Sequence, residues 1–244
     1  MTMAVRRTVL ACLLVVSGLA TAAPSGQFGF LRGSNRNVTF RADDGRTMTA
    51  LLVEANQRPA PAVVLVPMLG RSKDDWQPLA DKLADAGITA IAIDLPGQSL
   101  PGDPAALAGW YTVIAATVSY LVGRPDVRAY AIGVAGASLG ANLAAVAAAA
   151  DPRIRSLALI SPSLDYRGVR IEGALTQYGD RPALLVASLK DPYAARSVRE
   201  LAAIGGTREM LWSETPAHGT VLLAREPDLN RSLAEWFRRT LPVN

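Results

Sequence analysis

The stretch YAIGVAGASLGANLAAVAAAA, residues 130–150, changes character in its middle. As far as Val134 it is an apolar run suited to a buried strand, and from Leu139 it is an alanine-rich run suited to a helix. Only the four residues AGAS separate the two runs. The chain is therefore expected to turn from strand to helix at one tight corner, with Ser138 standing at that corner.

Apolar strands and helices alternate on both sides of this corner. Residues 37–55 predict a hairpin of two alternating strands joined at Asp43-Asp44-Gly45. The other predicted strands are 61–69, 88–94, 127–134, 156–161, 182–189 and 208–213. The predicted helices are 73–87, Pro104 to Val122, Leu139 to Ala150, Ala194 to Ile204 and Leu229 to Leu241.

Continuous Val/Ile/Leu strands separated by helices are typical of a parallel sheet that is covered on both faces. We therefore expect an α/β protein with three layers. A mostly parallel sheet would begin with an antiparallel hairpin and carry helices on both faces.

The first residues have the pattern of an export signal. Arg6 and Arg7 form a basic start, the apolar run TVLACLLVVSGLA follows, and Ala20-Thr21-Ala22 is a small-residue cleavage site. We expect an exported protein, periplasmic or secreted, whose mature chain is not stably inserted in a membrane. A chain anchored in the membrane by an uncleaved N-terminus is the alternative, although the run is short for a spanning helix. The predicted divisions are a signal peptide at 1–22, a leader at 23–37 and a folded domain at 38–244.

Composition argues against several classes of function. The chain has 25 basic and 21 acidic side chains, and its arginines are interleaved with acids, so we expect no nucleic-acid partner. Its one cysteine, Cys12, lies in the export segment, so the mature chain is expected to have no disulfide. His218 is the single histidine, which leaves little for a zinc or redox metal site. We expect neither a metal nor a cofactor.

Gly136-Ala137-Ser138-Leu139-Gly140 is a G-x-S-x-G pattern between a strand and a helix, the context that a nucleophile elbow requires. In an elbow, the serine takes a strained backbone conformation that lifts its hydroxyl above the edge of the sheet. The two glycines remove side chains that would collide with the neighbouring strand and helix. Ser138 is the candidate nucleophile, and a glycine-rich turn with an incidental serine is the alternative.

A serine hydroxyl needs a base to take its proton, and histidine is the usual base. His218 follows the last apolar strand and precedes the last helix, although a lone histidine is as often structural. The acid that orients the imidazole should follow the preceding strand, as Asp191 does, with helix capping as its alternative role. Asp165 also follows a strand and is the second candidate. Asp180 precedes its strand and therefore belongs to the wrong end of the sheet.

Several stretches resemble one known family. VAGASLGANLA, SLKDPYA and AHGTVLL look like the elbow, acid loop and histidine loop of the α/β-hydrolase superfamily, in particular of small capless bacterial serine esterases similar to dienelactone hydrolase. DLPGQSLPGD resembles a turn that these enzymes carry after a strand. VLVPMLGRSKDDWQPLADKLA resembles their oxyanion segment, with Pro67-Met68 in place of the common His-Gly. The resemblance implies oxyanion-binding N–H groups from Leu139 and from Met68 or Leu69.

These residues together predict a serine hydrolase that cleaves a small-molecule carboxylic ester through an acyl-enzyme on Ser138. Ser138, Asp191 and His218 would form the catalytic triad. Only about twenty residues separate the strands 156–161 and 182–189, so a large cap has no room and the site should be open. The alternative is a non-catalytic exported module that uses the same fold to bind a ligand or a partner.

Overall fold

The computed structural model describes residues 35–42, 45–97, 99, 101–103, 106–107 and 109–241. The predicted signal peptide, 1–22, lies outside the described residues, as do Asp43 and Asp44 of the predicted hairpin turn. The first strand begins at Asn35, so the last three residues of the predicted leader, 23–37, belong to the sheet. All described residues fall within one compact unit, Leu31–Asn244.

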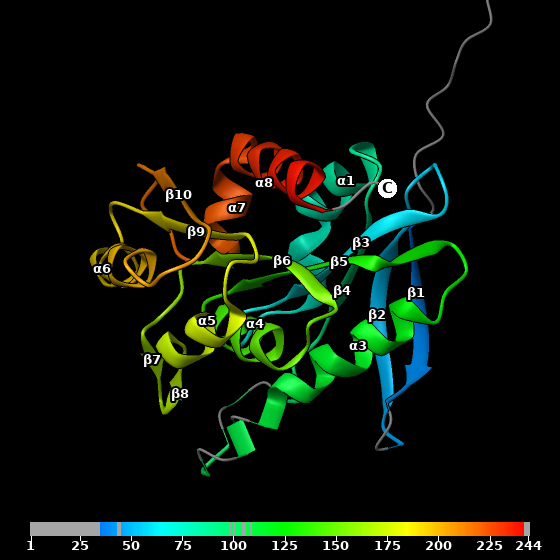
Figure 1. The fold of residues 1–244 in the computed structure, drawn as a ribbon, viewed down its shortest axis with the longest axis horizontal. Helices are drawn as coiled ribbons and strands as arrows, with labels where there is room; N and C mark the ends of the chain where they lie inside the picture. Colours follow the sequence, from blue (N-terminus) through cyan, green and yellow to red (C-terminus); the bar gives the residue numbers. More distant parts are fainter. Residues whose placement is uncertain are drawn as a thin grey trace, which may run out of the picture. The chain divides into compact units, whose positions relative to one another are not determined.

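Within the described residues, eight strands form one sheet in the order β1-β2-β4-β3-β5-β6-β9-β10 (Figure 1). The strands are β1 Asn35–Arg41, β2 Thr47–Val53, β3 Ala60–Val66, β4 Thr89–Ile93, β5 Val127–Ala137, β6 Ile154–Ile160, β9 Ala183–Ser188 and β10 Arg208–Ser213. β1 pairs antiparallel with β2, and β2 pairs antiparallel with β4. The other neighbours pair in parallel, which confirms the predicted sheet with its antiparallel start. A separate short hairpin joins β7 Asp165–Tyr166 to β8 Val169–Arg170.

Helices cover both faces of the sheet (Figure 1). The helices are α1 Gln77–Asp85, α3 Thr112–Val122, α4 Leu139–Ala150, α5 Glu172–Tyr178, α6 Pro192–Ala202, α7 Thr220–Arg225 and α8 Pro227–Thr240. α1, α7 and α8 contribute to one apolar core, and α3, α4, α5 and α6 contribute to the other. α8 does so through a stripe at helical spacing, Leu229, Leu233 and Phe237, whereas α4 is buried almost all round by small alanines. No helix in the described part of the chain is long and apolar enough to cross a membrane.

Several helix ends differ from the sequence-based expectations. The helix expected from Pro104 to Val122 is α3, preceded by a 3-10 turn at Gly109–Tyr111, while Pro104 itself lies outside the described residues. The helix expected over 73–87 starts as a 3-10 turn, Lys73–Trp76, before α1 begins. α6 and α8 each begin two residues before the predicted start, because each opens on a proline, which suits the first turn of a helix.

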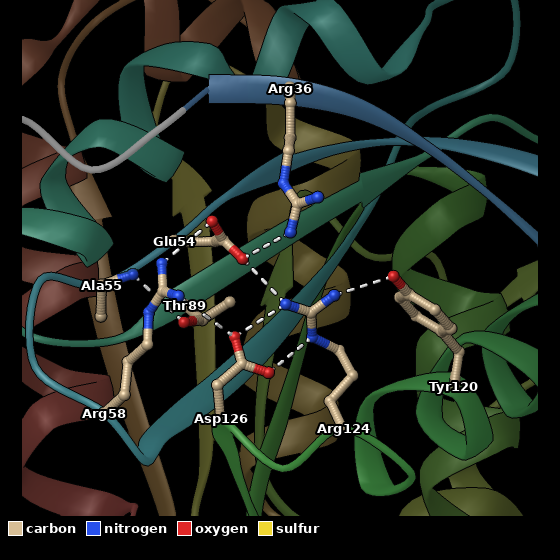
Figure 2. A network of polar contacts seen from close by, with 8 residues as sticks. All are labelled: Arg36, Glu54, Ala55, Arg58, Thr89, Tyr120, Arg124 and Asp126. Atoms are coloured by element: carbon tan, nitrogen blue, oxygen red, sulfur yellow. Dashed lines mark hydrogen bonds and ion pairs between the residues drawn. The ribbon is translucent and has the colours of Figure 1, made fainter.

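A buried carboxylate ties together the amino ends of the parallel strands. Glu54 follows β2, its side chain is 4% exposed, and it forms ion pairs with Arg36 at 2.8 Å, Arg58 at 3.0 Å and Arg124 at 2.8 Å (Figure 2). Arg124 also pairs with Asp126 at 2.7 Å, directly before β5. These contacts join the edge hairpin β1–β2 to the centre of the sheet.

Candidate active site

The corner between β5 and α4 has the geometry of a nucleophile elbow. Ser138 stands there with φ 51° and ψ −120°, a conformation that costs free energy for any residue other than glycine. Its N–H donates to the carbonyl of Ile160 at 2.9 Å, and its carbonyl accepts from the N–H groups of Ala141 and Asn142. The strained serine is therefore held by the next strand on one side and by the first turn of α4 on the other.

The two glycines of the motif are required by close backbone contacts. A Cβ atom on Gly136 would lie 2.2 Å from the carbonyl oxygen of Gly140. A Cβ atom on Gly140 would lie 2.4 Å from the carbonyl oxygen of Pro67. No side chain fits at either position, as the sequence predicted. The second contact also places the first turn of α4 against the segment that follows β3.

Ser138, His218 and Asp191 form one hydrogen-bonded chain. His218 Nε2 lies 2.8 Å from Ser138 Oγ, and His218 Nδ1 lies 2.5 Å from Asp191 Oδ2. Ser138 follows β5, Asp191 follows β9 and His218 follows β10, so all three lie at the carboxyl edge of the parallel strands. Ser138 is buried, whereas the His218 side chain is 39% exposed. Solvent and ligands can therefore reach the imidazole.

Asp191 also caps a helix, so both roles considered for it from the sequence are present. Its Oδ1 accepts from the N–H of Ala194 at 3.1 Å, in the first turn of α6, while Oδ2 faces His218. The cap fixes the carboxylate in the orientation that the imidazole needs.

Asp165 has other partners. Its carboxylate accepts from the N–H of Gly168 at 2.6 Å and from the guanidinium of Arg170 at 2.9 Å, within the β7–β8 hairpin. The hydrogen bond from Arg170 lowers the pKa of Asp165 below its ordinary value. Asp180 lies in the turn before β9, at the amino end of that strand. The structure thus brings Asp191, and not Asp165, to the imidazole.

The three candidate oxyanion donors lie in two segments that touch each other. Leu139 is the first residue of α4, where an N–H group has no acceptor within the helix. Met68 and Leu69 follow β3, the strand beside β5. The Met68 side chain packs against the histidine loop, since its sulfur would lie 2.7 Å from a Cβ atom on Gly219. The segment after β3 therefore lies beside the first turn of α4 and beside the histidine loop.

Sequence reasoning missed the contact that fixes the far end of the Met68–Leu69 segment. Asp94, just after β4, accepts from the backbone N–H of Lys73 and from its ammonium, both at 2.9 Å. The hydrogen bond to Asp94 raises the pKa of Lys73. The two residues lie 21 positions apart, so no local charge pattern signals the pair. Among the described residues, no group of three His, Cys, Asp or Glu side chains is placed to hold a metal ion.

Comparison with known proteins identifies the class. Residues 63–243 match the alpha/beta hydrolase family, and the chain belongs to that family. Over 97 residues it is 34% identical to the 2,6-dihydropseudooxynicotine hydrolase of Paenarthrobacter nicotinovorans. That match covers 39% of this chain and 26% of the relative, so it spans about a quarter of the relative's length.

Solved structures with little sequence identity share the fold. A dienelactone hydrolase from Anabaena variabilis ATCC 29413 superposes with a TM-score of 0.74 at 19% identity, covering 86% of this chain and 100% of that one. A thermostable carboxylesterase cloned from a metagenomic library superposes with a TM-score of 0.66 at 19% identity, covering 86% of this chain and 90% of that one. The expected membership of the α/β-hydrolase superfamily is confirmed, and so is the expected likeness in fold to a dienelactone hydrolase.

Proposed function

We propose that this protein is a serine hydrolase that cleaves a carboxylic ester through an acyl-enzyme on Ser138. The observation that carries the proposal is the continuous hydrogen-bonded chain from Asp191 through both ring nitrogens of His218 to the hydroxyl of Ser138. A strained serine in an elbow, a base and an orienting acid are the parts that acyl transfer to serine requires.

The geometry supports the following sequence of steps. Ser138 Oγ attacks the ester carbonyl carbon while His218 Nε2 takes its proton, and Asp191 stabilises the resulting imidazolium. The oxyanion accepts hydrogen bonds from the N–H of Leu139 and from that of Met68 or Leu69. His218 then gives its proton to the leaving alkoxide, and the alcohol departs. A water molecule, deprotonated by His218, then attacks the acyl carbon. The bond to Ser138 Oγ breaks, His218 returns the proton to this oxygen, and the carboxylic acid departs.

Two features favour a small ester as the substrate. The segment between β6 and β9, which the structure describes throughout, carries the β7–β8 hairpin and the seven-residue helix α5, too little chain for a large cap at this point. Alcohols are also better leaving groups than amines. Proteins of similar fold include enzymes named as a dienelactone hydrolase and a carboxylesterase, which is consistent with ester cleavage. We propose an exported enzyme, periplasmic or secreted, and the export pattern at 1–22 supports this location.

The decisive experiment combines a mechanism-based label with a nucleophile variant. Purified protein is treated with a fluorophosphonate probe, and its hydrolysis is measured with p-nitrophenyl esters of increasing acyl length beside lactone and aminoacyl-amide substrates. We expect labelling and ester hydrolysis in the wild type and neither in Ser138→Ala. The melting temperature should stay unchanged, because alanine keeps the same backbone.

Two results would overturn the proposal. One is an unlabelled wild-type protein that is correctly folded, which would favour a non-catalytic binding module. The other is a Ser138→Ala variant that still hydrolyses the ester at the wild-type rate.

A further inference from the structure

Three serines lie at the carboxyl ends of three neighbouring strands, and none of them takes part in the mechanism above. Ser161 directly follows β6, Ser188 is the last residue of β9, and Ser213 is the last residue of β10. Their exposed fractions are 0%, 0% and 3%. A buried hydroxyl costs free energy unless it is hydrogen-bonded, so the partners of these three groups indicate what they hold in place.

All three hydroxyls bond to the loop that carries His218. The N–H of Gly219 donates to Ser161 Oγ at 3.0 Å in a fully buried contact. At the other end of the loop, Ser188 Oγ donates to the carbonyl of Thr215 at 2.6 Å, and the N–H of Thr215 donates to Ser213 Oγ at 3.0 Å. We call Ser161, Ser188 and Ser213 the serine clamp. His218 lies between the two points at which the clamp holds the backbone.

Ser161 also connects this loop to the nucleophile. The residue before it, Ile160, accepts the hydrogen bond from the N–H of Ser138 at 2.9 Å. Ser161 has φ 50°, a conformation that non-glycine residues rarely adopt, and its own N–H donates to the carbonyl of Val186 at 2.7 Å. One pair of adjacent residues thus bonds to the backbone of Ser138 and to the residue after His218. Strained residues of this kind persist where the surrounding structure determines them, often at functional sites.

We propose that Ser161 sets the position of the His218 imidazole relative to Ser138, while Ser188 and Ser213 fix the opposite end of the loop. Ser161 is a positioning residue, because its hydroxyl accepts from the Gly219 N–H and the residue is fully buried from solvent. The inference rests on the proposed function for its kinetic effect. Its effect on the imidazole itself can be observed independently of any substrate.

The test compares serines at the two ends of the same strand. Ser161→Ala removes the clamp contact, and Ser156→Ala is the matched control. Ser156 lies in β6, is 0% exposed and donates its hydroxyl to Thr240 Oγ1 in α8 at 3.0 Å, a contact outside the histidine loop. Ser161→Gly serves as the second variant, since glycine removes the same hydroxyl while tolerating the positive φ.

We expect both Ser161 variants to lower kcat by at least about tenfold with little change in KM, because a small displacement of a catalytic base slows the reaction strongly. Ser156→Ala should keep the wild-type kcat. Since the chain has a single histidine, protein labelled with ¹⁵N at histidine reports His218 alone. Its imidazole signals should shift in the Ser161 variants and stay in place in Ser156→Ala.

Wild-type kcat together with unshifted imidazole signals in both Ser161 variants would overturn the inference. An equal loss of kcat in Ser156→Ala would do the same, since it would show a general packing effect. Failure of the proposed function gives a different result, namely a wild-type protein without esterase activity or fluorophosphonate labelling. The imidazole signals would still decide the role of Ser161 in that case.

Discussion

At the scale of single residues, Asp191 uses its two carboxylate oxygens for two tasks. One oxygen caps α6 and the other faces His218. These tasks differ chemically. A cap needs only an acceptor for a backbone N–H, which an amide oxygen also provides. Orientation of the imidazole needs an acceptor beside Nδ1 that also stabilises the imidazolium, and a neutral amide does this poorly.

We therefore predict that Asp191→Asn lowers kcat by about 10³-fold or more while the melting temperature changes little. Asp165→Asn is the control, because Asp165 also follows a strand but pairs with Arg170 in the β7–β8 hairpin. Its kcat should stay close to that of the wild type, because the Asp165 carboxylate bonds to Gly168 and Arg170 and not to His218. Steady-state kinetics and thermal unfolding of both variants check the ranking. Equal losses would show that the acid is assigned wrongly.

Lys73 gives a prediction that depends on pH. Its folded-state pKa is raised by Asp94, so the pair stabilises the fold below the unfolded pKa of 10.5 and loses this contribution as the pH rises through the folded value. At pH 7, Lys73→Met should lower the free energy of unfolding by about 1 kcal/mol. The difference from wild type should shrink above pH 10.5.

Urea unfolding at neutral and alkaline pH measures both values. Lys82→Met is the control, since Lys82 is half exposed and lies 3.8 Å from Asp85. It should change stability by at most about 0.5 kcal/mol at either pH. A loss for Lys73→Met that stays constant with pH would contradict the assignment of the effect to charge.

At the scale of elements, the elbow depends on how closely α4 approaches two strands. We predict that Gly140→Ala destabilises the fold by about 1–3 kcal/mol, because the new Cβ would overlap the carbonyl oxygen of Pro67. Activity should fall with it, since relief of the overlap moves Ser138 away from the segment after β3. Gly173→Ala in α5 is the control. No heavy atom lies within 4 Å of its added Cβ, so stability should stay the same or rise by up to about 1 kcal/mol.

Denaturant unfolding and ester hydrolysis are measured for both glycine variants. A Gly140→Ala protein as stable and as active as the wild type would show that α4 can move without moving the nucleophile.

The elements that the sequence predicted best are those with strong local signals. α4 has the predicted bounds, Leu139–Ala150, because an alanine run follows a strand and a glycine corner directly. α7, Thr220–Arg225, escaped prediction because six partly apolar residues favour strand, helix and loop almost equally. The start of α3 was misplaced because Gly109 interrupts the helical pattern with a 3-10 turn.

Residue type and strand order were enough to predict part of the candidate site. Ser138 lies in a G-x-S-x-G pattern, and His218 is the single histidine of the chain. Strand order ranked Asp191 above Asp165, because Asp191 follows the strand that precedes the strand before His218. The tertiary structure adds the contacts that separate the two acids, since Asp191 lies 2.5 Å from His218 and Asp165 pairs with Arg170. The serine clamp could not be predicted from the sequence, because the contact between Ser161 and Gly219 joins residues 58 positions apart.

At the scale of the whole molecule, the Glu54 network lies at the amino ends of the parallel strands, and the candidate site lies at their carboxyl ends. We predict that Glu54→Gln lowers the free energy of unfolding by about 3 kcal/mol, because removing this charge leaves the mostly buried Arg124 without one of its carboxylate partners. The kcat of the folded variant should be unchanged. Glu200→Gln is the control, since Glu200 forms an exposed pair with Arg196 that is worth at most about 0.5 kcal/mol.

Denaturant unfolding and kinetics of both glutamate variants distinguish an effect on stability from an effect on activity. A loss of kcat in Glu54→Gln under conditions where the variant is fully folded would show that the Glu54 network influences the candidate site at the other end of the strands.

The strand order has a consequence for how substrate preference can change. β3 lies between β4 and β5, and the chain leaves β3 toward α1 on one face but leaves β5 into α4 on the other. The connections that follow these two adjacent strands therefore lie on opposite faces of the sheet. This arrangement forms a crevice at a topological switch point. Ser138 begins one connection and Pro67 begins the other. The connection that begins at Pro67 can lengthen without displacing β5 or the tight corner at Ser138, so the acyl group of the proposed ester can vary while the hydroxyl of Ser138 stays in place.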